Sequence, residues 1–208
     1  MTNPPSPTTA PLPDFLPPAL CALAREQSLT RGETLFRRGQ RPTRVFFVAA
    51  GEIHLLRHGV HGQAVIFQRS AAGSFLAEPS IDSPGYHCDA VAVAASRLRV
   101  FPLADFRSAL DADPAFARRW RLFLAREIRR LRGRAERLAM RSVRERIVHY
   151  IECEGEDGML SWSGELKALA AELGVTHEAL YRALARLAAD GLLERAPGCL
   201  RLIGSGRL

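Results

Sequence analysis

Residues 166–188 contain side chains that can read DNA bases, set in a pattern typical of two crossing helices. The apolar positions that would hold both helices to a domain are Leu169, Leu173, Val175, Leu180 and Ala183. Ala170 is small enough to let the helices approach, and Gly174 can adopt the positive φ that ends the first helix. Thr176 is an expected N-cap for the second helix. The pattern predicts a helix-turn-helix.

The second helix, expected over 176–188, would present polar and aromatic side chains near its N-terminal end, the end that a recognition helix inserts into the major groove. These residues are Thr176, His177, Glu178, Tyr181 and Arg182. Arginine can bond two acceptors of guanine, and glutamate can accept from the cytosine amino group. Glu178 and Arg182 are four residues apart and share one helix face. The alternative is an ordinary helical hairpin with a surface Glu–Arg pair.

Turn and strand signals follow this second helix. Gly191 precedes Leu192 and Leu193, and after a Pro-Gly turn at 197–198 the apolar residues Leu200 and Leu202 alternate with polar ones. This pattern predicts a short hairpin, the wing of a winged helix-turn-helix DNA-binding domain at 141–208. A C-terminal domain that binds protein instead is the competing interpretation, and an exposed Arg182 would argue against it.

The helix that would precede this domain, over 113–140, carries a narrow apolar stripe. Its members are Trp120, Leu124, Ile128, Leu131, Ala135 and Leu138, spaced 4, 4, 3, 4 and 3. This spacing is typical of a coiled-coil seam, and the flanking positions are mostly arginine. We expect the stripe to form a homodimer interface across a two-fold axis. Packing of the stripe against the chain's own β-domain is the alternative.

Residues 14–112 show short alternating runs separated by glycine, after a short helix expected near 17–25. The expected strands are 34–36, 45–49, 52–57, 64–68, 90–94 and 97–101. Strands at this spacing predict a compact β-sandwich or barrel, so the fold class is α+β. Residues 1–13, rich in Pro, Ser and Thr, are expected to be a disordered tail.

Composition narrows the class of protein. The net charge of +7 favours a polyanionic partner without specifying one. The four cysteines form no CxxC pair, so we expect no zinc ribbon or other metal site, and no disulfide framework of the secreted type. The N-terminus does not resemble a signal peptide, and no run of residues is apolar enough to span a bilayer. A cytoplasmic protein without a membrane partner is expected.

Several segments together resemble the Crp/Fnr family of transcriptional regulators. They are GETLFRRGQ at 32–40, VFFVAAGEIHLLR at 45–57, GSFLAE at 73–78, RLAMRSVRERI at 137–147 and KALAAELGVTHEALYRALARLAADGLL at 167–193. The resemblance extends from about residue 14 to 203. It implies a homodimer with a jelly-roll-like, cyclic-nucleotide-binding-like β-roll effector domain, a dimerisation helix and a winged helix-turn-helix. It also implies a palindromic operator with half-sites about 34 Å apart, and RNA polymerase as a partner.

The resemblance also assigns residues. Glu178 and Arg182 fall on the family's shared base-reading positions, and His177 stands where the cAMP-responsive member has arginine. Members that bind cyclic nucleotide have a Gly-Glu pair and, about ten residues later, an Arg-Ser pair. Here these pairs are Ala77-Glu78 and His87-Cys88. A neutral histidine lacks the permanent charge that a phosphate needs, and Leu131 and Arg132 replace hydroxyl residues that contact adenine. The effector pocket would comprise Glu78, His87, Cys88, Leu131 and Arg132, and cAMP is not the expected effector.

The histidines and cysteines of the chain also bear on other effector chemistries. An iron–sulfur cluster is not expected, because Cys21 is the one cysteine near the N-terminus. A haem-based sensor stays open, with His54, His58, His61, His87 and Cys88 as candidate axial ligands. A redox role for Cys88 or Cys153 is opposed by adjacent carboxylates, which should raise the thiol pKa. Enzymatic activity is not expected, since neighbours such as His87 and Cys88 in a strand point to opposite faces.

Overall fold

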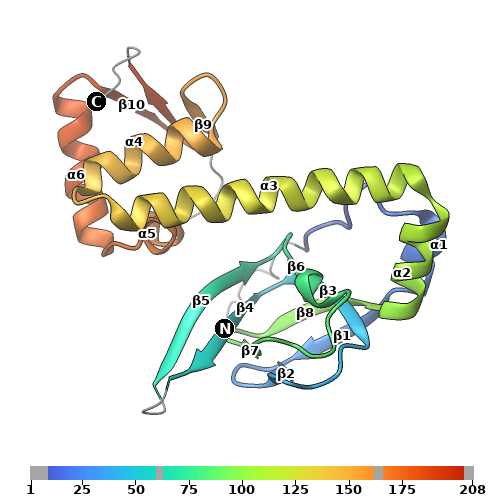
Figure 1. The fold of residues 1–208 in the computed structure, drawn as a ribbon. Helices are drawn as coiled ribbons and strands as arrows, with labels where there is room; N and C mark the ends of the chain where they lie inside the picture. The colour runs from blue at the N-terminus through green and yellow to red at the C-terminus, as the bar shows by residue number, and fades with distance from the viewer. Residues whose placement is uncertain (1–8, 60–62, 162–165, 204–208) are drawn as a thin grey trace, which may run out of the picture. The chain divides into compact units, whose positions relative to one another are not determined.

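The computed structural model describes residues 9–59, 63–161 and 166–203, without the side chains of residues 167 and 168 (Figure 1). The tail expected over 1–13 therefore lies mostly outside the described residues. The chain divides into two compact units, Met1–Arg121 and Leu122–Leu208. No helix in the described ranges has the length and apolar character needed to cross a membrane.

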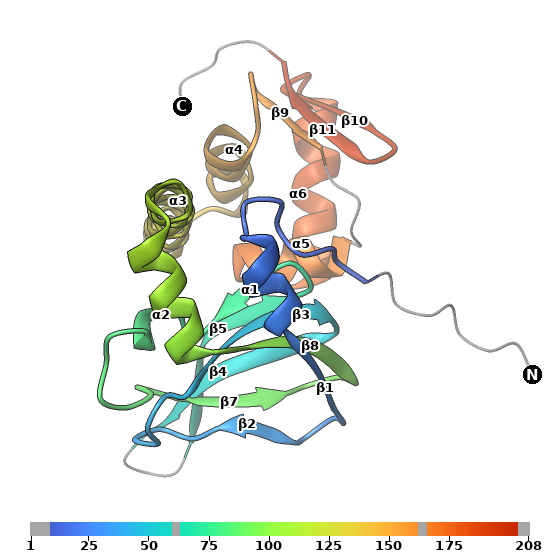
Figure 2. The ribbon, with the colours of Figure 1, turned by 90° about the vertical axis from the view of Figure 1, so that its right-hand side faces the viewer.

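The N-terminal unit is a sandwich of two four-stranded antiparallel sheets (Figure 2). Its elements are α1 Pro18–Leu23, β1 Arg25–Leu29, β2 Thr34–Phe36, β3 Arg44–Ala50, β4 Glu52–His58, β5 Ala64–Ala71, β6 Phe75–Leu76, a 3-10 turn Glu78–Ser80, β7 Asp89–Ala92, β8 Ser96–Pro102 and α2 Leu103–Ala112. The strand orders are β1-β8-β3-β6 and β2-β7-β4-β5. The core lies between the sheets, where Phe46 and Leu98 from one sheet pack with Ile53 and Leu55 from the other.

All six strands predicted from alternation are present, with ends shifted by up to three residues. Two strands of this unit were missed. The polar run REQSL of β1 has only Leu29 buried, and β6 is two residues long, so neither gives an alternation signal. The helix predicted over 17–25 ends at Leu23, because the chain is extended from Arg25 and pairs with β8.

The turn between β3 and β4 depends on a glycine. Gly51 has φ +86, in the region that side chains rarely occupy. A Cβ there would lie 2.5 Å from the main-chain oxygen of Ala95 and would also clash with the Ser96 hydroxyl. The Glu52 amide donates to that hydroxyl at 3.2 Å, so the glycine lets β4 start directly against the beginning of β8.

Trp120 belongs to the core of this same unit. Its side chain is 4% exposed, and its ring centroid lies 5.1 Å from that of Phe75 and 5.0 Å from that of Phe106. Phe116 lies one helical turn earlier, with its centroid 6.4 Å away. The prediction that Trp120 forms the dimer interface is therefore wrong, because an aromatic cluster of its own unit already covers it.

The C-terminal unit contains three helices and a small sheet, together with most of the long helix α3, Pro114–Ala139. Its remaining elements are α4 Val143–Glu154, β9 Met159–Ser161, α5 Leu166–Leu173, α6 His177–Ala189, β10 Leu193–Ala196 and β11 Cys199–Leu202. The sheet order is β10-β11-β9, antiparallel throughout. The hairpin of the predicted wing is confirmed, whereas β9 was missed because three residues show no periodicity. The α+β class is confirmed.

We predict that Gly51→Ala destabilises the protein more than Gly73→Ala does. Both glycines have positive φ, at +86 and +94, but a Cβ at Gly73 would meet nothing within 4 Å. Backbone strain alone should cost Gly73→Ala about 1–3 kcal/mol, and overpacking should cost Gly51→Ala about 2 kcal/mol more. Urea unfolding followed by circular dichroism measures both. Equal losses would show that the contact with Ala95 and Ser96 is relieved without cost.

Candidate nucleic-acid interface

The turn between α5 and α6 is built as a helix-turn-helix requires. Gly174 has φ +67, and the Val175 amide donates to the Ala170 oxygen at 3.0 Å, which closes the end of α5. The Thr176 hydroxyl accepts from the Ala179 amide at 3.2 Å and caps α6. The glycine turn and the N-cap predicted from the sequence are both confirmed.

Burial on α6 fixes which of its faces is presented to solvent. Leu180, Leu184 and Leu187 are buried in the core of the unit. The five candidate base readers, Thr176, His177, Glu178, Tyr181 and Arg182, are all exposed. Their assignment as base contacts stays a prediction, but the structure places all five on the accessible side of the helix.

The first turn of α6 favours a charged glutamate. Hydrogen bonds from its own main-chain amide and from the Thr176 side chain hold the pKa of Glu178 below its usual range, and the neighbouring His177 and Arg182 act in the same direction. Glu178 is therefore ionised at neutral pH. An ionised carboxylate is an acceptor that can pair with a cytosine amino group.

A cation from the wing joins this surface. The Arg195 guanidinium, on β10, lies 5.6 Å from the ring centroid of Tyr181, which is 52% exposed. The His177 and Tyr181 rings lie 6.5 Å apart on the same side of α6. Sequence reasoning missed Arg195, because no local spacing relates a hairpin residue to a helix. We call α6 residues 176–182 with Arg195 the α6–wing surface.

The apolar stripe of α3 is exposed after Trp120 and Leu124. Ile128 is 50%, Leu131 49% and Leu138 64% exposed, and Ala135 is also exposed. Leu124 is half-buried. Large apolar side chains at this spacing on one helix form a surface suited to a second helix.

The five residues expected in the effector pocket are divided between the units. Glu78, His87 and Cys88 belong to the N-terminal unit, whereas Leu131 and Arg132 belong to the C-terminal unit. Neither unit brings the five together.

The segment at 87–88 contains an imidazole and a thiol, where the resemblance would place an Arg-Ser pair. Cys88 is 1% exposed within the sandwich core. Burial, with the Arg57 charge adding to it, lowers the pKa of His87, so this imidazole is neutral at neutral pH. Arg57 approaches from β4, but its Nε donates to the His87 main-chain oxygen at 2.9 Å. Ala77, at the position of the family's glycine, has φ +70.

The histidines considered as haem ligands do not converge. His54 Nε2 lies 2.6 Å from Glu52 Oε1, and His58 Nδ1 lies 3.3 Å from Asp89 Oδ2. His61 lies outside the described residues. Within those residues, the structure contains no group of three His, Cys, Asp or Glu side chains that could hold a metal ion.

The pKa values of Cys88 and Cys153 are raised, as expected, but the main cause differs from the expected one. Burial raises the pKa of Cys88 to about 11, and the charges of Asp89 and Glu78 add to this effect. Burial also raises the pKa of Cys153. The sequence indicated the carboxylates, but burial is the larger cause in both cases. Neither thiol has the lowered pKa of a redox sensor.

We predict that native Cys88 resists alkylation. With a pKa near 11, roughly one Cys88 in a thousand is a thiolate at pH 8, and its side chain is inaccessible. Cys153 is exposed and should react much faster with iodoacetamide. Mass spectrometry of proteolytic peptides over time measures both rates, and denatured protein, in which both should react alike, is the control. Equal rates in native protein would contradict the burial of Cys88.

Comparisons with known proteins found one matching domain family and several structures of similar fold. Residues 26–113 match the cyclic nucleotide-binding domain family. FixK2 from Bradyrhizobium japonicum is 20% identical, with a TM-score of 0.58 over 87% of this chain and 93% of that one. The Thermus thermophilus catabolite activator protein is 22% identical, with a TM-score of 0.50 over 89% and 88%.

A third structure shares the arrangement over nearly its whole length. The c-di-GMP-responsive regulator CLP from Xanthomonas campestris is 20% identical, with a TM-score of 0.51 over 89% of this chain and 96% of that one. No curated protein sequence matches the chain. The resemblance stated from the sequence is confirmed at the level of the fold: residues 26–113 match the cyclic nucleotide-binding domain family, and the chain shares its overall fold with these regulator structures.

Proposed function

We propose that the chain is a homodimeric, sequence-specific DNA-binding transcription regulator that inserts the N-terminal end of α6 into the major groove. The observation that carries the proposal is the α6–wing surface, where an ionised Glu178 and an exposed Arg182 lie one helical turn apart beside the Arg195–Tyr181 contact. Carboxylate and guanidinium groups read opposite members of a G·C pair. A wing cation beside them can bind the adjacent phosphates.

The dimer is supported by the exposed stripe on α3. Pairing of two copies through Leu124, Ile128, Leu131, Ala135 and Leu138 would bury side chains that one copy leaves largely exposed. A two-fold axis along this seam would give two α6 helices facing a palindromic operator, with half-sites about 34 Å apart. Contact with RNA polymerase, expected from the architecture, is part of the same proposal.

Control by a cyclic nucleotide is not part of the proposal. The segment at 87–88 contains a neutral imidazole and a buried thiol where a phosphate would need a permanent cation. The chain therefore regulates in response to another signal or through its abundance.

We predict that Arg182→Ala weakens binding to an operator selected from genomic fragments. Loss of a bidentate base contact should cost about 1–3 kcal/mol, or roughly 5- to 150-fold in Kd. Arg41→Ala, which removes the same charge from an exposed position of the N-terminal unit, is the matched control and should change Kd little. Fluorescence anisotropy at fixed salt measures both. If wild type shows no sequence preference, or if both variants weaken binding equally, the base-reading role of Arg182 is wrong.

We predict that Leu131→Glu dissociates the homodimer. A carboxylate at the centre of the seam would face its two-fold mate, and burying that pair is unfavourable. Leu122→Glu is the control, because Leu122 is equally exposed, at 50%, but lies on another face of α3. Sedimentation velocity should show a monomer for Leu131→Glu and a dimer for wild type and Leu122→Glu. A dimer in all three would exclude the stripe as the interface.

A further inference from the structure

A hollow of about 520 Å³ lies in the C-terminal unit, away from the α6–wing surface. It is lined by Arg126, Arg129, Arg130, Arg132, Gly133 and Glu136 from α3 and by Cys153 and Glu154 from α4. None of these residues belongs to α6 or to the wing strands. The volume is within the range of small-molecule sites, about 300–1,000 Å³.

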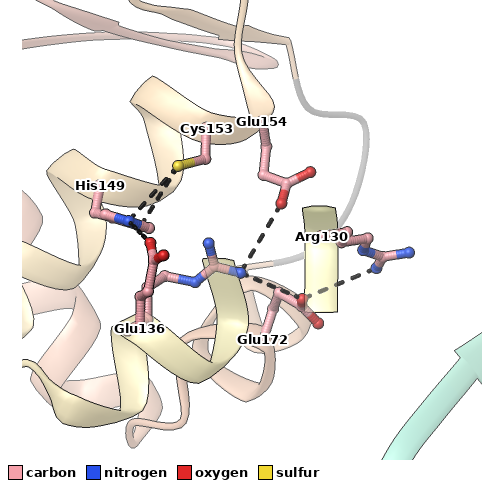
Figure 3. Close-up of polar contacts among 7 residues, drawn as sticks. Arg130, Glu136, His149, Cys153, Glu154 and Glu172 are labelled. Atoms are coloured by element: carbon pink, nitrogen blue, oxygen red, sulfur yellow. Dashed lines mark hydrogen bonds and ion pairs between the residues drawn. The ribbon is translucent and has the colours of Figure 1, made fainter. Parts of the chain in front are cut away.

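The lining is unusually basic for a hollow. It contains four arginines and two glutamates. Arg126 lies three residues before Arg129 and four before Arg130, so its charge faces both of theirs along the helix and repels them. Glu136 is engaged with α4 rather than with these arginines, because its Oε2 lies 2.9 Å from His149 Nε2 (Figure 3). An anion in the hollow would relieve this repulsion.

A buried cation lies beside the lining. Arg137 is 1% exposed, and in the described structure its Nε, Nη1 and Nη2 have no hydrogen-bond partner. Its Nη2 lies 3.9 Å from both Glu154 Oε1 and Glu172 Oε1, too far for a hydrogen bond. Its guanidinium stacks 4.8 Å from the Tyr150 ring centroid. Buried donors without acceptors are costly, and an arriving oxygen would lower that cost.

Gly133 lies between the hollow, which it lines, and the Arg137 guanidinium. A Cβ at this position would lie 3.2 Å from Arg137 Nη1 and 3.8 Å from His149 Cε1. The Nη1 donors therefore lie directly against the glycine that lines the hollow. A glycine inside a helix costs about 1 kcal/mol relative to alanine, and here it leaves the approach to Nη1 without a side chain.

We propose that this hollow binds a small non-aromatic polyanion, bearing phosphate or carboxylate groups, through Arg126, Arg129, Arg130 and the donors of Arg137. Guanidinium groups form bidentate bonds with both classes of anion. Among the described residues that line the hollow, none is an aromatic on which a base could stack. Duplex DNA is not the expected occupant, because its phosphates lie on a convex surface and Arg137 is buried. The site does not depend on the DNA-binding proposal.

The apolar stripe of α3 does not compete with this site. Arg126, Arg130, Gly133 and Arg137 are spaced 4, 3 and 4, which places them along one face of α3. The stripe at Ile128, Leu131 and Leu138 follows the opposite face. The hollow would stay open in the proposed homodimer.

The Glu172 carboxylate competes with the ligand for two of these cations. Glu172, on α5, pairs with Arg130 Nη2 at 3.9 Å as well as with Arg137. Both pairs are long, so an anion that forms shorter, charge-assisted bonds can displace Glu172. Since α5 is the first helix of the helix-turn-helix, binding in the hollow would alter the contacts that hold α5 to α3.

Isothermal titration of the full chain with pyrophosphate and with citrate, at constant ionic strength, tests the site. Saturable binding of at least one probe is expected. The double variant Arg126→Ser/Arg130→Ser should weaken that binding by about tenfold or more. The control Arg118→Ser/Arg119→Ser removes the same charge from exposed positions of the same helix, in the N-terminal unit, and should change Kd by less than about twofold.

Glu172→Gln gives a result that misfolding cannot imitate. This variant keeps the shape of the side chain but removes the competing charge, so pyrophosphate or citrate should bind several-fold more tightly than to wild type. The proposal is overturned if neither probe binds saturably, if the control pair weakens binding as much as the lining pair, or if Glu172→Gln leaves the affinity unchanged or lower.

Discussion

The turn from Gly174 to Thr176 is the constraint on which the proposed output of this protein depends. Gly174 at φ +67 ends α5, and the Thr176 hydroxyl begins α6, so the direction and rotation of α6 are both set within three residues. Leu180, Leu184 and Leu187 then fill the core, which leaves the opposite side of the helix for Glu178 and Arg182. A rotation of α6 by one residue would turn these side chains about 100° away.

Much of this arrangement could be predicted because local spacing carried the information. Alternating strands revealed β2, β3, β4, β5, β7 and β8, and the glycine and N-cap located α6 to within one residue. Features that depend on partners distant in the sequence were not predicted. The polar strand β1 exists through pairing with β8, and β9 through pairing with β11.

Side-chain contacts between residues distant in the sequence were likewise not predicted. Trp120 has the right spacing for a helix seam, but Phe75 and Phe106, which come from other elements, bury it in the N-terminal unit. Arg195 and Arg137 acquire their roles from contacts with Tyr181 and with Glu154 and Glu172. No periodicity in the sequence could have indicated those contacts.

The segment at 87–88 and the proposed anion sites of the C-terminal unit differ in charge. At 87–88 the β-sandwich has a neutral imidazole and an inert thiol, whereas the C-terminal unit has arginines in a hollow and on the α6–wing surface. Both proposed anion contacts, with DNA through α6 and with a small ligand in the hollow, lie in the C-terminal unit.

Hydroxyl-radical footprinting on an operator selected by the purified protein tests the central claim most directly. A homodimer that inserts two α6 helices should protect two patches related by a two-fold axis, with centres about 34 Å apart along one face of the duplex. Absence of protection, or a single patch without two-fold symmetry, would contradict the account of α6 as a recognition helix in a symmetric dimer.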